Sequence, residues 1–467
     1  MNDVDRYIQF SQFRSQIRGS QTHLIVGIDI AKDKHHAFFG TANGKTLWRR
    51  LIFTNDIIGY TRLIEQAQVL LSQHKLGEVV FGLEPTSNYH KPLAYWLIKQ
   101  QYLVVMVAGK AIKDNRELLD GRWDKNDTKD SANVADLISQ GKCLFYEQPD
   151  EDIVVVRNLL VIRKQLKKEE HILRMRIRNG LIAKYFPEMD RYWGHCLEEN
   201  LAIVRWYLDP QKISNTEFEK FVLHVTTTNR GARQMRRLRA IHQAAGESVG
   251  MPVDEAAGYE AQLLVERLRQ VKEQVSQTMQ RLESECQNLS GYKLLLTIPG
   301  FGPYISALVV GALANPFRFT SRKQVIRLAG LDLNASRSGK KSQDSVPKIS
   351  KRGKADLRYA LYQAALIASY HNDGFRRLYH GMLEGRHGER GIKTKVRVKL
   401  AAKMLVVAWT MLKTMNLLIP GACWVSPFDN LETRISGGTI MDHPTSPGYK
   451  VSGEAEIGPA GEQPIEE

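Results

Sequence analysis

The sequence contains only four cysteines, and these are scattered along the chain at Cys143, Cys196, Cys286 and Cys423. None of them stands in a C-x-x-C pair, the spacing typical of structural zinc sites and of thiol redox motifs. Zinc and disulfide chemistry are therefore not expected. We expect free thiols in a reducing compartment.

Long apolar runs are also missing. The longest run, residues 404–411, is well short of the roughly 20 residues that a membrane-spanning helix needs, and Lys399 and Lys403 stand beside it. The first residues lack the basic-then-apolar order of a signal peptide. We expect a cytoplasmic protein without a membrane partner.

Acidic residues are scarce in one long segment. Residues 291–413 contain 23 Lys and Arg but only 6 Asp and Glu, whereas the residues from 421 onward contain 2 and 8. The whole chain has a formal net charge of +16. A basic region attracts polyanions, so nucleic acid is the expected partner. The acidic end, 421–467, is rich in Gly and Pro and is predicted to be a disordered tail.

Four acidic residues stand out against this background. Asp29 lies inside the apolar run 24–30, Glu84 ends the apolar run that starts at 79, and Asp127 and Asp130 follow downstream. A carboxylate in or at the end of a buried strand is costly unless a cation or hydrogen bond compensates it. Hard cations prefer such oxygen ligands, and two Mg²⁺ ions held by them would support phosphodiester cleavage or transfer.

The order of elements over residues 23–150 is typical of a ribonuclease-H-like (RuvC-like) α/β domain. Such an order places Asp29 within the sheet and Glu84 at the end of a neighbouring strand, and a helix would turn Asp127 and Asp130 to one face. Residues 1–22 are predicted to be a loose lead-in. The expected strands are 24–30, 37–40, 47–53, 79–83 and 102–107, with a turn at Asn43 and Gly44, and the expected helices are 56–73 and 89–100.

The segment 151–290 is predicted to be a helical linker. Apolar residues recur at coiled-coil spacing, so its two long helices are expected to pair with each other or across a dimer. An antiparallel hairpin that only separates two domains is the alternative. An insertion at 187–252 contains four close arginines, which would either contact phosphates or form a solvated helix face: Arg233, Arg236, Arg237 and Arg239.

The segment 291–420 is predicted to be a mainly α-helical domain. Gly300 and Gly302 form a turn before a helix, as in a helix-hairpin-helix, where glycines let backbone N–H groups approach a phosphate. A plain helix–helix turn would need only one of them. A Gly/Ser/Lys-rich loop at 334–354 and long helices near 355–370 and 393–416 follow.

Seven short motifs occur in a fixed order in the segments 23–150 and 291–420. They are GIDIAK at 27–32, LEPT at 83–86, DKNDTKDSA at 124–132, IPGFG at 298–302, AGL at 329–331, RSG at 337–339, and ISKRG at 349–353 with LR at 357–358. In this respect the sequence resembles the DEDD transposases of the insertion sequence 110 family, which are bridge-RNA-guided recombinases.

The resemblance implies a RuvC-like domain, a coiled-coil linker and a C-terminal transposase domain. It makes Asp29, Glu84, Asp127 and Asp130 the Mg²⁺ ligands and Ser338 a nucleophile that forms a phosphoserine link to DNA. It further implies donor and target DNA, a structured bridge RNA, a homodimer or tetramer, and a place at the bacterial nucleoid. The residues expected to contact nucleic acid are Gly300, Gly302, Arg337, Lys340, Lys341, Lys351, Arg352 and Arg358.

The same residues fit two other functions. A junction-resolving nuclease of the RuvC type would use the same four acids with water as its nucleophile and would not need Ser338. A noncatalytic nucleic-acid-binding scaffold would keep the acids only for structural reasons. His35 and His36 lie near the first acid, but neighbouring residues of a strand point to opposite faces, so at most one of them faces the acids.

Overall fold

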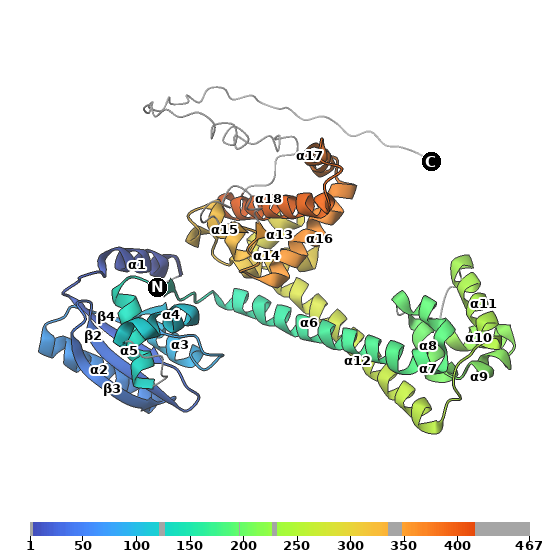
Figure 1. Cartoon of the computed structure of the whole chain (residues 1–467), viewed down its shortest axis with the longest axis horizontal. Helices are drawn as coiled ribbons and strands as arrows, with labels where there is room; N and C mark the ends of the chain where they lie inside the picture. Colours follow the sequence, from blue (N-terminus) through green and yellow to red (C-terminus); the bar gives the residue numbers. More distant parts are fainter. Residues whose placement is uncertain (1–2, 121–126, 196, 227–230, 335–347, 416–467) are drawn as a thin grey trace, which may run out of the picture. The chain divides into compact units, whose positions relative to one another are not determined.

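The computed structural model of this 467-residue chain describes residues 3–120, 127–195, 197–226, 231–334 and 348–415. An α/β region comes first in the chain, and mainly helical regions follow it (Figure 1). Two predicted segments lie outside the described residues. They are the tail at 421–467 and the loop that contains Ser338.

A six-stranded mixed sheet forms the centre of the N-terminal region, which fits a ribonuclease-H-like fold. Its strand order is β3-β2-β1-β4-β5-β6, with β1 antiparallel to β2 and parallel to β4. The predicted hairpin is confirmed, and Gly44 in its turn has a φ of +81°, which glycine adopts without strain. The strands are β1 (His23–Asp29), β2 (Lys34–Thr41), β3 (Thr46–Thr54), β4 (Glu78–Leu83), β5 (Leu103–Met106) and β6 (Leu144–Phe145).

Helices cover both faces of this sheet because successive strand residues point to opposite sides. On β1, Leu24, Val26 and Ile28 belong to the core under α2 (Ile57–His74) and α3 (Lys91–Lys99). Ile25 belongs to the other core, under α4 (Gly109–Asp120) and α5 (Asp127–Ser139). The α2 helix begins where the Asp56 carboxylate accepts a hydrogen bond from the Gly59 N–H at 2.8 Å.

The prediction of a loose lead-in at residues 1–22 is wrong. Residues Asp3–Gln16 form helix α1, and Phe10, Phe13 and Ile17 are buried in the core that α4 and α5 share with the sheet. These three apolar residues recur at spacings of three and four, so the helix hides one narrow stripe in an otherwise polar sequence. The lead-in is therefore part of the α/β region.

Two long helices of the linker pack against each other within one chain. They are α6 (Glu151–Arg176), which continues into a π-helical turn at Ile177–Ile182 and the short α7 (Ala183–Tyr185), and α12 (Glu255–Gln287). Arg176 pairs with Glu260 at 2.7 Å, and Arg267 pairs with Glu169 at 2.7 Å. The residue numbers of the partners on α12 fall as those on α6 rise, so the two helices are antiparallel.

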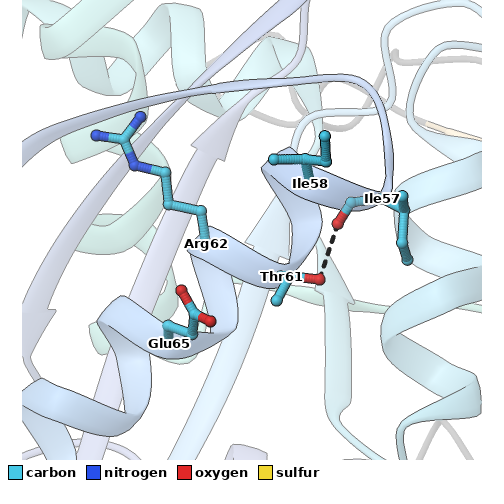
Figure 2. A pocket seen from close by; sticks show the side chains of 5 residues that line it. All are labelled: Ile57, Ile58, Thr61, Arg62 and Glu65. Carbon is cyan, nitrogen blue, oxygen red and sulfur yellow. Dashed lines mark hydrogen bonds between the residues drawn. The ribbon is translucent and has the colours of Figure 1, made fainter.

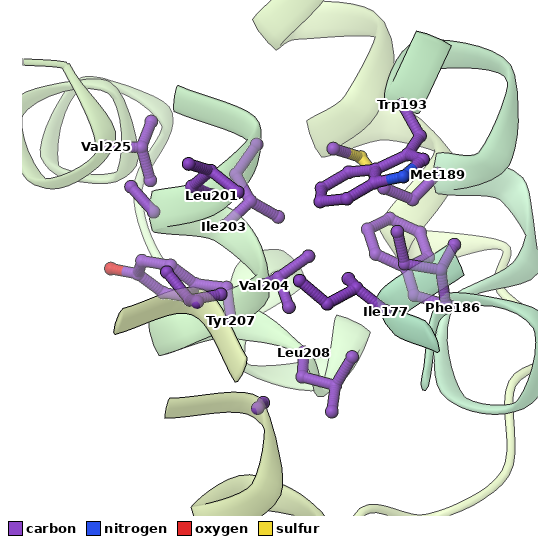
Figure 3. Packing of buried hydrophobic residues seen from close by; sticks show 14 of the residues in the cluster. Ile177, Phe186, Met189, Trp193, Leu201, Ile203, Val204, Tyr207, Leu208 and Val225 are labelled. Carbon is purple, nitrogen blue, oxygen red and sulfur yellow. The ribbon is translucent and has the colours of Figure 1, made fainter. Parts of the chain in front are cut away.

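The insertion between these helices packs around a hydrophobic core that it shares with them. Trp193, Phe186 and Met189 point toward one another and toward Ile203 and Val204 (Figure 3). Residues from α6 and α12 complete this core. Its elements are a 3-10 helix (Pro187–His195), α8 (Glu198–Tyr207), α9 (Pro210–Ser214), α10 (Phe218–Val225) and α11 (Ala232–Gly246).

The basic C-terminal region is mainly helical, as predicted. Within the described residues, no helix is long and apolar enough to cross a membrane. The elements of the C-terminal region are α13 (Ser290–Leu296), α14 (Pro303–Leu313), a 3-10 turn (Pro316–Arg318), α15 (Arg322–Leu328), the two-stranded ribbon β7 (Leu333–Asn334) and β8 (Lys348–Ile349), α16 (Ala355–His371), α17 (Asp373–Leu383) and α18 (Ile392–Thr414). The helices near 355–370 and 393–416 are confirmed, and α17 between them is additional.

Candidate active site

Asp29 is the last residue of β1 and Glu84 directly follows β4, and the two acids stand at the same level of the sheet. Strands β1 and β4 are parallel, and Ile28 is paired with Leu83, so the next residue of each strand is one of these two acids. Both acids are half-buried. The carboxyl ends of parallel strands are thus where the structure brings the first two predicted acids side by side.

Two glycines fix which face of the sheet these acids share. Gly27 and Gly82 are paired in the β1–β4 register, and each stands two residues before one of the acids, hence on the same face. A Cβ on Gly27 would lie 2.2 Å from the Ser131 carbonyl oxygen, and one on Gly82 would lie 1.9 Å from a methyl carbon of Ile138. Helix α5 therefore lies directly on this face, and α5 also carries Asp127 and Asp130.

Asp130 is almost fully buried and is bound by an arginine. Only 3% of the residue is exposed, and its Oδ1 accepts a hydrogen bond from Arg116 Nε at 3.0 Å and forms an ion pair with Nη2 at 2.8 Å. Arg116 belongs to α4, which packs against α5. The guanidinium supplies the compensating charge that a buried carboxylate requires.

A buried polar network also connects α4 with α5. Asn115 donates to Asn133 Oδ1 at 2.8 Å and to Asp136 Oδ2 at 2.8 Å, and Asn133 donates to the Ile112 carbonyl oxygen at 2.7 Å. None of the sequence motifs includes Asn115, Asn133 or Asp136. The available signal was the three-residue spacing of Asp130, Asn133 and Asp136 beside apolar residues of the same helix.

Glu84 lies against the first residue of α4. A Cβ placed on Gly109 would be 2.5 Å from Oε1 of Glu84, so only a glycine leaves room for this carboxylate position. The N-terminal end of a helix favours negative charge. The start of α4 therefore suits an acidic side chain at this position.

The donor set suits a hard divalent cation, because all four predicted ligands are carboxylates. Asp29, Glu84 and Asp130 lie on elements that meet on one face of the sheet. Asp127 is the first residue of α5, and its side chain is outside the described part. Among the described side chains, however, no three His, Cys, Asp or Glu groups are close enough together to hold a metal ion.

The two neighbouring histidines point to opposite faces, as expected. His36 is paired with Asp29 across β1 and β2, and paired residues of antiparallel strands share a face. His35 is buried on the other face, where its ring lies 5.2 Å from that of Phe53 and its Nδ1 accepts a hydrogen bond from the Ala31 N–H at 3.2 Å. Burial lowers the pKa of His35. His36 is therefore the histidine on the acidic face.

Ser338, Arg337, Lys340 and Lys341 lie outside the described residues, but both ends of their loop are described. Strands β7 and β8 pair Leu333 with Ile349 and Asn334 with Lys348 on either side of the gap at 335–347. Backbone hydrogen bonds extend this pairing from Ser350 to Asp332 at 2.8 Å and from Lys351 to Gly330 at 3.0 Å. The serine loop thus begins and ends at one point of the C-terminal region.

The other predicted basic contacts differ in what they touch. Lys351 and Arg352 are exposed. Arg358 instead donates to the carbonyl oxygens of Ala329 at 3.0 Å and Lys351 at 3.4 Å. Its guanidinium therefore stabilises the turn that holds the AGL motif against the ISKRG motif.

The two glycines of the helix-hairpin-helix-like turn have different surroundings. Gly300 has a φ of +85°, and a Cβ there would lie 2.4 Å from the Ala364 carbonyl oxygen on α16. Gly302 is the N-cap of α14 and faces open space. Packing alone explains Gly300, whereas Gly302 keeps the exposed position that approach to a phosphate requires.

An open pocket lies on the α/β region, along the first turns of α2 (Figure 2). It is lined by Ile57, Ile58, Thr61, Arg62 and Glu65. Because α2 covers the face of the sheet opposite α5, this pocket is separate from the acidic residues.

Comparison with protein families gives two matches in the order that the motifs predict. A DEDD transposase model of the IS110 family matches residues 26–187, and a model described as transposase of the IS116/IS110/IS902 family matches residues 292–380. A search of curated proteins gave no significant match. The two models together cover more than half of the chain, one including the acidic face and the other the ribbon that bounds the serine loop. The chain therefore belongs to the IS110 family of transposases and is a DNA transposase.

Proposed function

We propose that this transposase cuts and rejoins DNA in a magnesium-dependent reaction that passes through a phosphoserine intermediate. The observation that supports the acidic half of the site best is the β1–β4 register, which sets Asp29 and Glu84 side by side under α5. DEDD transposases typically use divalent metal ions, in keeping with an all-carboxylate donor set.

Asp29, Glu84, Asp127 and Asp130 are the proposed ligands. When bound, Mg²⁺ would offset the negative charge that develops on the phosphate oxygens during transfer. Both contacts of Arg116 fall on Oδ1 of Asp130, so we assign Oδ2 to the ion. Gly109 keeps the Glu84 carboxylate at the start of α4.

Ser338 is the proposed nucleophile. Its Oγ would form a bond to the phosphorus of a DNA strand while the bond from phosphorus to the sugar oxygen breaks, and that oxygen would leave with a proton. A sugar hydroxyl of a second strand would then attack the phosphoserine, release Ser338 and restore a phosphodiester. Arg337, Lys340 and Lys341 would offset charge on the phosphate.

We further propose that a structured bridge RNA selects the donor and target DNA and that the active form is a homodimer or tetramer at the nucleoid. The excess of basic residues at 291–413 supports binding to nucleic-acid backbones. An assembly is required if Ser338 of one subunit completes the acidic site of another. The α6–α12 pairing occurs within one chain and so does not argue for a dimer.

Covalent capture tests the serine mechanism. Purified protein, element DNA, the flanking noncoding RNA and Mg²⁺ are combined, and denaturing gels are read for protein–DNA adducts and strand-exchange products. We expect both products from the wild type and neither from Ser338→Ala or Asp29→Asn. Ser336→Ala, a serine two residues away in the same loop, is the matched control and is expected to react normally.

The same assay separates the alternatives. DNA cleavage by Ser338→Ala, together with inactive Asp29→Asn, would indicate a junction-resolving nuclease that uses water. Binding without any cleavage by the wild type, with or without Mg²⁺, would indicate a scaffold. Strand exchange by the wild type in the absence of RNA would refute the proposal that a bridge RNA guides the reaction.

A further inference from the structure

The insertion stands outside both family matches, which end at residue 187 and resume at 292. It nevertheless packs around a buried core that it shares with α6 and α12 (Figure 3), so its fold supports a defined surface. Its most basic element is α11, which has four arginines and no acidic residue over its 15 residues.

Arginines elsewhere in the linker and insertion are mostly neutralised by carboxylates. Arg176 pairs with Glu260, Arg205 with Glu266 and Arg267 with Glu169. Such ion pairs satisfy the charge of a guanidinium within the fold. An arginine without such a partner therefore leaves an uncompensated cation at the surface.

The arginines of α11 divide into two groups. Arg237 turns inward and forms an ion pair with Glu199 of α8. Arg233, Arg236 and Arg239 are exposed; Arg239 lies over the Phe218 ring with its guanidinium carbon 5.1 Å from the ring centroid. Neither Arg233 nor Arg236 has an ion-pair partner in the part of the chain that the structure describes.

The three exposed arginines form a row, which we name the α11 arginine row. They are three residues apart, so successive Cα atoms step about 4.5 Å along the helix axis. The opposite side of α11 is anchored in the core by Leu238 and Ile241. A fixed row of cations without interspersed acids suits a ligand with repeated negative charge better than a single carboxylate.

We propose that the α11 arginine row binds the sugar–phosphate backbone of a nucleic acid, independently of base sequence. The proposal rests on the proposed function, in which the enzyme handles both DNA and RNA. It gives the insertion a role as an additional phosphate-binding surface. DNA and RNA present the same phosphate chemistry, so separate binding measurements on each distinguish them.

The test measures binding of the full-length protein to a labelled DNA duplex and, separately, to a structured RNA over a range of salt concentrations. The triple variant Arg233→Gln, Arg236→Gln, Arg239→Gln is compared with wild type by fluorescence anisotropy. Each lost phosphate contact lowers the slope of log K against log salt by about 0.7–0.9. We expect the slope to fall by about 2–3 and the affinity at low salt to fall at least tenfold, on one or both ligands.

Matched variants control for net charge and folding. Arg49→Gln, Arg50→Gln, Arg62→Gln removes three exposed positive charges from the α/β region and is expected to keep the wild-type slope. Substitution of the row by lysine keeps the charge and should also preserve the slope. Loss on RNA alone assigns the row to RNA, and loss on DNA alone assigns it to DNA.

Unchanged slope and affinity on both ligands would overturn the proposal. So would an equal loss in the control variant, because a general charge effect would then explain the result. This assay reads binding alone and requires no strand cleavage. A failure of the cleavage mechanism is therefore distinguishable from a failure of the α11 arginine row.

Discussion

Gly27 and Gly82 matter because of the side chains that they lack. They form a register pair on adjacent strands, and α5 lies where their Cβ atoms would be. The distance between α5 and the sheet, and with it the position of Asp130 relative to Asp29, depends on these two residues. Protein interiors resist even one added methyl group when backbone is the neighbour.

Gly27→Ala is expected to lower the free energy of unfolding by about 1–3 kcal/mol through overpacking, because the Ser131 carbonyl oxygen and the Ala135 N–H belong to helix backbone. Chemical denaturation measures the change. Gly77→Ala is the control, since nothing lies within 4 Å of its added Cβ. Equal stability of the two variants would contradict the close packing of α5.

Arg116 is the second residue on which the site depends. Its side chain is 19% exposed and that of Asp130 only 4%, so the pair stabilises a carboxylate that would otherwise be buried without compensation. A bound divalent cation and Arg116 would both attract the same carboxylate. Removal of the arginine should therefore destabilise the protein and make it more dependent on metal.

Arg116→Gln is expected to lower the free energy of unfolding by about 3 kcal/mol and to increase the rise in melting temperature that Mg²⁺ or Mn²⁺ produces. Calorimetric melting with and without metal measures both effects. Lys110→Gln breaks the exposed Lys110–Asp114 pair on the same helix and should change little. A metal-dependent rise equal to that of wild type would argue against Asp130 as a ligand.

At the scale of elements, α6 and α12 form the connection between the α/β region and the C-terminal helices along the chain. The apolar seam of α12 is used within the subunit, with Leu264, Leu268 and Val271 in the core of the insertion. The prediction of paired helices is confirmed, in its antiparallel form. On α6, Ile162 stands three residues after the buried Leu159 but is exposed.

Leu268→Ala is expected to destabilise the protein by about 2–5 kcal/mol, because Leu268 is fully buried and its truncation leaves a cavity. Leu263→Ala removes the same atoms from the same helix at a position that is 52% exposed, and it should change stability by less than about 0.5 kcal/mol. Urea denaturation compares the two. Similar effects would mean that the seam is not packed as described.

Glu147 joins two elements at the start of this linker. Its carboxylate forms an ion pair with Arg157 of α6 at 2.8 Å and another with Arg318, which follows α14, at 2.7 Å. Burial alone would raise the pKa of Glu147, but Arg318 and Arg157 outweigh it and hold the pKa below its ordinary value of 4.5. The contribution of this carboxylate is therefore complete above that value and is lost as pH falls through the lowered pKa.

Glu147→Gln is accordingly expected to be less stable than wild type by about 3 kcal/mol at neutral pH. The difference should shrink progressively below pH 4.5, because wild-type Glu147 becomes protonated there. Denaturation midpoints of both proteins over an acidic pH series provide the measurement. A difference that is constant with pH would show that the ionised form contributes nothing.

At the scale of the whole molecule, charge is distributed by region. The excess of basic residues lies at 291–413, whereas the acidic residues of the site lie near the start of the chain. This separation suits a transposase, because basic residues bind the phosphates of DNA whereas carboxylates bind metal ions. Binding to DNA should be governed by release of counterions from the phosphates.

DNA affinity is therefore expected to fall by about 10³–10⁵-fold between 50 and 200 mM salt, the range for 6–10 phosphate contacts. Fluorescence anisotropy titrations at several salt concentrations would determine the slope. An affinity that barely changes over this range would mean that the basic region makes few phosphate contacts.

Local patterns were enough to predict much of the α/β region. The apolar run before Asp29 and the one before Glu84 became β1 and β4, and the spacing of Asp127 and Asp130 suited the helix α5 on which both lie. Helix α1 was missed because its apolar stripe, Phe10, Phe13 and Ile17, is short and gains meaning only against the sheet. A partner distant in sequence cannot be inferred from local spacing.

The sequence by itself determined strands β1 to β5, the regional charge and the family, because periodicity, composition and motifs are local properties. Only the tertiary structure decided which neighbours the key side chains have. It paired Asp130 with Arg116, turned Arg237 inward while Arg233 stays exposed, and set α5 on Gly27. Each of these outcomes depends on packing between separate elements, where burial removes water and makes the choice of partner decisive.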